Sequence, residues 1–151
     1  MFDHTTHASL SDRFDLQRFV DAQAEVIGCV RAELSTGRKR SHWMWFVFPQ
    51  IAGLGASAMS ARYAIGGAPE ARAFLAHPLL GVRLAELTVL VVGLRGRSAR
   101  AIFGTPDDVK FRSCMTLFAE VGPADAPFAL ALERYFGGAR DPATLARLNE
   151  I

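Results

Sequence analysis

Seven side chains in two short segments have types and spacings suited to binding or catalysis. The segment RKRSHWMWFVFPQ (38–50) contributes Lys39, His42, Trp45 and Gln50, and the segment TPDDVKFRSCMTLF (105–118) contributes Asp107, Lys110 and Ser113. Amines stabilise anions, and an imidazole titrates near neutral pH. We therefore predict that these seven residues line one polar pocket, with Tyr63 and His77 as weaker additions.

The aromatic segment has a second interpretation as part of the core. If residues 42–48 form a helix, it is apolar almost all round, and such a helix is usually central and buried. Aromatic side chains pack more often than they bind ligands, whereas polar residues at the two ends of a buried segment need partners or a cavity. His42 and Gln50 are those residues, and a structural role for His42 stays open.

The second segment also has a plain interpretation. On a helix that begins near residue 106, Asp107 could pair with Lys110, and Asp108 could pair with Arg112, as surface ion pairs. The alternative is a ligand at the helix N-terminus, where Lys110 would hold an anion and the acids would contact a hydroxyl or act as a base. If the site is catalytic, His42 or Asp107 would be the acid or base.

Several familiar chemistries are not predicted. The loop IAGLGAS (51–57) lacks the Gly-Lys-Ser/Thr of a nucleotide-binding P-loop and does not follow a strand. The four histidines and two cysteines lack metal-ligand spacing, so we predict neither a metal nor a cofactor. Cys29 and Cys114 both lie in apolar helical stretches, and we expect two buried free thiols.

The elements that must position these side chains are helical. Apolar residues recur at steps of three and four within residues 22–35, 78–94 and 106–121. Possible N-caps of the expected helices and turns are Asp21, Ser41, Ser57, Ser98, Thr105 and Asp141. Further short helices are expected at 42–48, 58–63, 68–77, 125–136 and 141–150, and a turn capped by Ser98 is expected to end at Gly104. Strand and hairpin signals are scarce. We predict an all-α, single compact domain of about seven to eight helices over residues 14–151, after a flexible tail (1–13).

Composition restricts the partners. The chain has 151 residues, 17 Lys and Arg, 15 Asp and Glu, and a formal net charge of +2. This balance does not favour nucleic acid or a membrane surface as a partner. The N-terminus lacks a secretory signal pattern, and no apolar run reaches the roughly 20 residues needed to span a bilayer. We therefore expect a soluble, cytoplasmic protein.

A set of motifs resembles a known bacterial family. It comprises Gly37-x-Lys39-x-Ser41-His42-Trp43-Met44-Trp45, Phe48-Pro49-Gln50, Gly53-Leu54-Gly55-x-Ser57, Phe103-Gly104-x-x-Asp107-Asp108-x-Lys110 and Thr116-Leu117-Phe118. This pattern is similar to the family known as domain of unknown function 1810, from about Phe14 to Leu148. The resemblance implies a compact all-helical fold and no established activity. Lys39 belongs to the signature, whereas Arg38 and Arg40 do not.

Two functions follow as hypotheses. In the first, the pocket beside HWMWFVFPQ binds a small polar metabolite or nucleotide-like ligand. In the second, part of the aromatic segment is exposed and docks a protein partner or a second copy of the chain. Buried tryptophans beside a lined cavity would favour the first, and solvent-facing tryptophans on a flat surface the second.

Overall fold

Residues 12–150 are described by a computed structural model, and they form ten helices and no strand. The helices are α2 (Gln17–Ala24), α3 (Ile27–Ser35), α4 (Met44–Val47), α5 (Ala58–Arg62), α6 (Ala68–Ala76), α7 (Leu80–Val92), α8 (Ala99–Phe103), α9 (Asp107–Val121), α10 (Pro127–Phe136) and α11 (Pro142–Asn149). The prediction of an all-α domain is confirmed. The predicted flexibility of residues 1–13 concerns mostly residues outside the described range.

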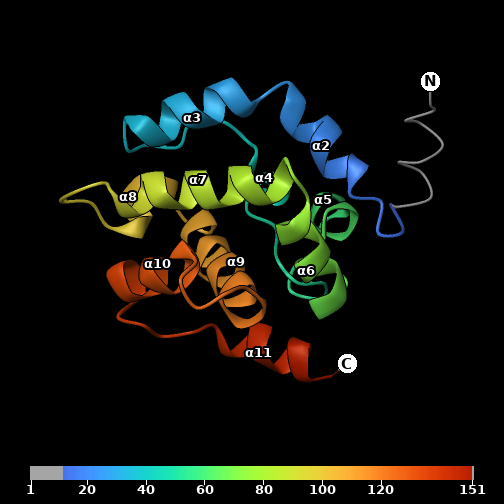
Figure 1. Cartoon of the computed structure of the whole chain (residues 1–151). Helices are drawn as coiled ribbons and strands as arrows, with labels where there is room; N and C mark the ends of the chain where they lie inside the picture. The colour runs from blue at the N-terminus through green and yellow to red at the C-terminus, as the bar shows by residue number, and fades with distance from the viewer. Residues whose placement is uncertain (1–11, 151) are drawn as a thin grey trace.

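Two helices, α7 and α9, make most of the packing contacts. Helix α10 packs on both of them, α6 also contacts both, α3 lies along α7, and α11 covers α9 (Figure 1). Phe111, Cys114, Met115, Leu117 and Phe118 of α9 are completely buried. The four-residue α4 lies at one end of this core, where Phe48 packs edge-on against Phe103 and Phe111. The core therefore holds the aromatic segment directly beside the start of α9.

The predicted helix over residues 22–35 is two helices. Helix α2 ends at Ala24 and α3 begins at Ile27 because the two pack on different neighbours, α2 on α4 and α3 on α7. The buried Gln23 amide donates to the carbonyl of Phe46 at 2.8 Å, and this hydrogen bond fixes the packing of α2 on α4. A periodic apolar pattern indicates that one face of a segment is buried, but it does not indicate that the first and second halves of the segment pack on different helices.

Side-chain caps begin three of the helices as predicted. The Ser57 hydroxyl accepts a hydrogen bond from the amide of Ser60, Ser98 accepts from Ala101, and Asp141 accepts from Thr144. The expected cap at Thr105 is absent, and Pro106 precedes α9 without a side-chain hydrogen bond. Ser41 does not cap α4 either, because its hydroxyl donates to Glu33.

The two cysteines differ. Cys114 is buried, and burial raises the pKa of its thiol well above the ordinary value. Cys29 is exposed, so its predicted burial was wrong. Helix α3 turns Val30 and Leu34 toward α7, which leaves the neighbouring Cys29 on the solvent side.

No single helix within residues 12–150 is long and apolar enough to cross a membrane. Helices α6 and α7 would together reach that length and composition, but they meet at a bend of 86°.

Candidate functional site

The carboxylate of Glu33, at the end of α3, holds the loop that leads into the aromatic segment. It accepts hydrogen bonds from the backbone amide of Arg40 at 2.9 Å and from that of Ser41 at 3.0 Å. It also accepts from the Ser41 hydroxyl at 2.5 Å and from the indole Nε1 of the buried Trp43 at 2.9 Å. One acidic side chain therefore satisfies four donors and determines where residues 40–43 lie.

This environment changes the acidity of Glu33. Burial alone would raise the pKa, but the hydrogen bonds from Ser41, Arg40 and Trp43 outweigh it and lower the pKa from 4.5 to about 2. The carboxylate is therefore ionised at every pH at which the protein would normally work. Oε1 accepts from the two amides and the indole, and Oε2 accepts from the Ser41 hydroxyl, so both oxygens of Glu33 are engaged within the fold.

Lys39, Asp107 and Lys110 form a second charged group at the start of α9. The Lys39 ammonium lies 2.8 Å from Asp107 Oδ2 and is only 6% exposed, whereas Lys110 lies 3.7 Å from Asp107 Oδ1 and is 24% exposed. Lys39 also donates to the carbonyl of Ser41 and lies over the Trp43 ring. One carboxylate thus serves two amines, with Lys39 closely paired, and Lys110 is the amine with charge left for a further partner.

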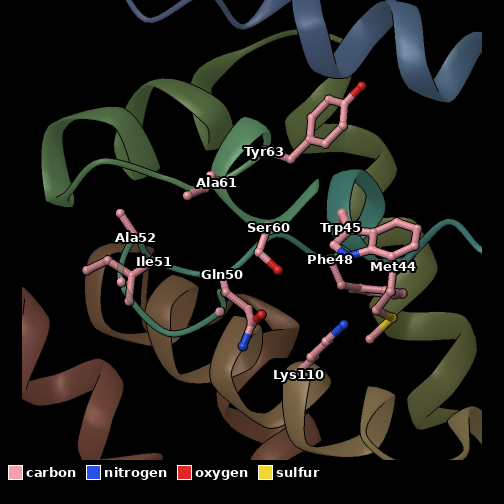
Figure 2. A pocket seen from close by; sticks show the side chains of 13 residues that line it. Met44, Trp45, Phe48, Gln50, Ile51, Ala52, Ser60, Ala61, Tyr63 and Lys110 are labelled. Atoms are coloured by element: carbon pink, nitrogen blue, oxygen red, sulfur yellow. The ribbon is translucent and has the colours of Figure 1, made fainter. Parts of the chain in front are cut away.

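A cavity of about 230 Å³ lies between the aromatic segment, α5 and α9. Figure 2 shows its three polar side chains converging from separate elements: the Lys110 amine from α9, the Gln50 amide from the loop after α4, and the Ser60 hydroxyl from α5. Trp45 supplies an aromatic ring, whereas Tyr63 lines the cavity with its ring and hydroxyl pointing away from these three groups. The Lys110 ammonium sits 5.4 Å from the Trp45 ring centroid.

The polar groups in this cavity are poorly satisfied. Among residues 12–150, no group forms a hydrogen bond with the Gln50 amide, and Lys110 has only the long contact with Asp107 and the Trp45 ring. Ser60 accepts a hydrogen bond from Ser57 at 3.0 Å and keeps its own proton for another partner. Amide, ammonium and hydroxyl groups that face a cavity without partners can bind a polar molecule.

One wall of the cavity needs glycine. Gly53 has a φ of +96°, and a Cβ there would lie 2.6 Å from the guanidinium carbon of Arg147. Arg147, on α11, donates to the Gly53 carbonyl at 3.3 Å. The loop of residues 51–55 is held further by the amide of Ala52, which donates to the carbonyl of Ile65 at 2.8 Å. Helix α11 therefore braces the wall of a cavity that it does not line.

The seven predicted site residues separate into three groups. Trp45, Gln50 and Lys110 line the cavity, while Lys39 and Asp107 pair behind it. His42 is exposed and does not line the cavity. Ser113 is buried and donates to Asp141 at 2.9 Å, toward α11.

The other sequence expectations have mixed outcomes. Tyr63 lines the cavity, whereas His77 accepts backbone hydrogen bonds at the start of α7. Burial lowers the pKa of His77, partly opposed by the charge of Asp12. The predicted pair of Asp108 with Arg112 does not form, because Arg112 donates to the carbonyls of Ala139 and Arg140. No group of three or more His, Cys, Asp or Glu side chains in the described part of the chain could hold a metal ion.

Sequence reasoning missed Glu33, Ser60 and Arg147. Glu33 lies on a helix where an acid normally faces water, and its partners are seven to ten residues further on in an irregular loop. Arg147 contacts a residue 94 positions away. The one available signal was the glycine pair in GLG (53–55), which indicates a close approach but not what approaches.

Fold and cavity together define a class: a single helical domain with a small, partly polar cavity beside its most aromatic segment. Within that class, residues 13–148 match the family described as protein of unknown function (DUF1810), and the chain belongs to this family. Its structure is similar to the crystal structure of the conserved hypothetical protein Rv1873 from Mycobacterium tuberculosis. The two are 54% identical with a TM-score of 0.90, over 91% of this chain and 99% of the other. No curated protein matches the chain significantly.

Proposed function

We propose that the cavity binds a small planar molecule that carries one anionic group. The observation behind this proposal is that Lys110, Gln50 and Ser60 turn polar groups with unused hydrogen-bonding capacity into the cavity beside the Trp45 ring. The Lys110 ammonium would pair with the anionic group, and the Gln50 amide and Ser60 hydroxyl would form hydrogen bonds with polar atoms at the edge of the ligand ring. The Trp45 ring would pack against the ligand ring.

The size of the cavity limits the ligand. A cavity of about 150 Å³ holds a benzene molecule, so 230 Å³ leaves room for one ring with a carboxylate or a similar charged substituent. A whole nucleotide would extend into solvent. Among nucleotide-like ligands, this favours a base-sized molecule over one with several phosphates.

The rival hypothesis of a docking surface receives less support from the aromatic segment. Trp43, Met44, Phe46, Val47 and Phe48 are all buried, with at most 7% of any of them exposed. Trp45 is half-buried and faces the cavity. A flat, solvent-facing apolar surface, which docking through this segment would need, is not formed by these side chains.

The test begins with native mass spectrometry of the purified protein, followed by thermal-shift and calorimetric titrations with benzoate, nicotinate and nucleoside monophosphates. We expect a ring carboxylate to bind and Lys110→Met to weaken binding at least about tenfold, which corresponds to about 1.4 kcal/mol. Gln50→Leu should weaken it less. Arg31→Met is the matched control, since it also removes one positive charge but lies on α3 with 49% side-chain exposure.

The proposal fails if wild-type protein shows neither a copurified mass nor any thermal shift with this panel. It also fails if Lys110→Met and Arg31→Met reduce binding equally, because the effect would then be one of total charge. A ligand that binds wild type and both variants alike would have to lie elsewhere on the molecule.

A further inference from the structure

Five arginines that are scattered in the sequence gather at one end of the molecule. Arg38 and Arg40 follow α3, Arg95 and Arg97 follow α7, and Arg100 lies in α8. The segments adjoin, because the amide of Lys39 donates to the carbonyl of Ile102 at 2.7 Å. A Cβ at Gly37 would lie 2.9 Å from the Arg97 guanidinium nitrogen. Figure 1 shows the end of α3, the loop after α7 and α8 on the same side. We call these five residues the arginine patch.

The side chains of the arginine patch are exposed and have no partner among residues 12–150. Most other arginines are engaged by a carbonyl, an amide or a carboxylate: Arg18, Arg31, Arg83, Arg112, Arg134, Arg140 and Arg147. Guanidinium groups bind carboxylates and phosphates in a two-pronged geometry. A cluster of unpaired guanidinium groups is therefore a surface for an anionic partner.

The overall charge conceals this surface. Removing the five arginines from the 17 Lys and Arg leaves 12, against 15 Asp and Glu. The segments 34–41 and 94–104 contain no acidic residue at all. The formal net charge of +2 is thus an average over one positive end and a negative remainder, and such a charge distribution orients an acidic partner as it approaches.

An open groove of about 600 Å³ adjoins the arginine patch, between the loop after α7 and the outer face of α10. It is lined by Leu94, Arg97, Leu130, Glu133, Arg134 and Tyr135, among others. Leu130 is 55% exposed. Arg134 donates to the carbonyl of Leu94, and the Tyr135 hydroxyl donates to that of Val91. These two hydrogen bonds hold α10 against the end of α7 and the loop that follows it. Cationic and apolar groups thus lie side by side, and Glu133 is the one acidic residue in the lining.

We propose that the arginine patch and this groove bind an acidic protein segment that carries an apolar side chain. The carboxylates would pair with the free guanidinium groups, and the apolar side chain would cover Leu94 and Leu130. Nucleic acid fits less well, because none of the strongly exposed apolar residues in the described part of the chain is aromatic and could stack on bases. A phosphate backbone also has no apolar group for the groove. This surface is independent of the cavity at Lys110.

The test is fluorescence anisotropy with labelled 12-residue probes: a poly-glutamate peptide with one central leucine, the same peptide with serine there, and single-stranded and duplex DNA. We expect the leucine peptide to bind at 50 mM salt and to lose about tenfold in affinity by 200 mM, since exposed charge pairs are screened. The serine peptide and the Leu130→Ser protein should each bind several-fold more weakly.

Charge reversal separates the patch from total charge. The triple variant R95E/R97E/R100E should bind at least about tenfold more weakly. The matched control R13E/R31E/R72E makes the same change in net charge at exposed arginines elsewhere and should bind within about twofold of wild type. None of the three patch side chains has a partner within residues 12–150, so circular dichroism should show intact folding.

Three outcomes would overturn the proposal. The first is no binding of the leucine peptide at 50 mM salt. The second is equal loss in both triple variants, which would show nonspecific attraction. The third is tighter binding of either DNA probe, which would make this end of the molecule a nucleic-acid surface.

Discussion

The loop at Glu33 and the cavity at Lys110 use neighbouring residues of the same family signature in opposite ways. At Glu33, four donors meet one carboxylate, and both of its oxygens accept hydrogen bonds from the loop. At Lys110, an ammonium, an amide and a hydroxyl face a cavity and have few partners of their own. A polar residue in an aromatic segment therefore indicates function only when its hydrogen bonds are incomplete.

Asp107 connects the two regions. It pairs closely with the nearly buried Lys39, which also contacts Ser41 and Trp43 of the first region, and loosely with Lys110 of the second. These three charged residues of the signature thus divide into a close structural pair, Lys39 with Asp107, and the loosely held Lys110. If this division is right, mutations should affect stability on one side and ligand binding on the other.

The largest effect on stability is expected at Glu33. Glu33→Ala leaves the buried Trp43 indole without its acceptor and frees three further donors. Since hydrogen bonds to charged groups contribute about 1.5–3 kcal/mol each and the donors near water can rehydrate, we expect a loss of about 3 kcal/mol. Urea unfolding followed by tryptophan fluorescence measures this loss.

Acid provides the control for Glu33. The folded-state pKa of about 2 lies below the ordinary 4.5, so the unfolded chain takes up the proton first as the pH falls. The stabilisation by Glu33 is therefore complete above about pH 4.5 and is lost as the pH falls toward 2. Glu33→Gln should lose less stability between these pH values than wild type does. Equal losses in the two proteins would assign acid sensitivity to other carboxylates and contradict the role given to Glu33.

A smaller effect is expected at Asp107, where one carboxylate faces two lysines. Asp107→Asn should cost about 2 kcal/mol, less than the 3–5 typical of a fully buried pair because the Asp107 side chain is 21% exposed. Double-mutant cycles with Lys39→Met and Lys110→Met divide this cost between the two lysines. We expect a coupling of about 1–2 kcal/mol for Lys39 and under about 0.5 for Lys110. Equal couplings would mean that Lys110 is as fully paired as Lys39 and has no charge to offer a ligand.

The helical fold could be predicted from the sequence because helix starts and buried helix faces depend on residues that are close together in the sequence. Asp141-Pro142, Ser57 and Ser98 mark helix starts through contacts three residues apart. The apolar stripe of α7 is visible for the same reason: Leu80, Leu84, Leu87 and Val91 are all buried. By contrast, the break between α2 and α3 depends on where α4 and α7 lie, which no local pattern records.

The candidate site was predictable only in part. Trp45, Gln50 and Lys110 were selected by residue type, and the fold brings them together across about 60 positions of sequence. Ser113 was selected by the same reasoning but serves Asp141, because one face of α9 meets α11. Residue type shows what a side chain could do. Whether a neighbour already occupies its polar atoms depends on tertiary packing, as Glu33 demonstrates.

The smallest effect is expected at His42, a residue of the Glu33 loop that we expect to contribute neither to stability nor to ligand binding. His42 lies between Ser41 and Trp43, two donors to Glu33, yet its own side chain is exposed and has no hydrogen-bond partner among residues 12–150. His42→Ala should change the free energy of unfolding by less than about 0.5 kcal/mol, as is usual for such surface positions. Binding of the ring carboxylates should also be unchanged, because His42 does not line the cavity. Parallel urea and calorimetric titrations of wild type and His42→Ala measure both.

A clear loss of binding with stability intact would place the imidazole at the ligand and extend the site beyond the cavity. It would also mean that a bound ligand draws the loop that Glu33 holds toward Lys110, so that the two regions would no longer divide structure from function.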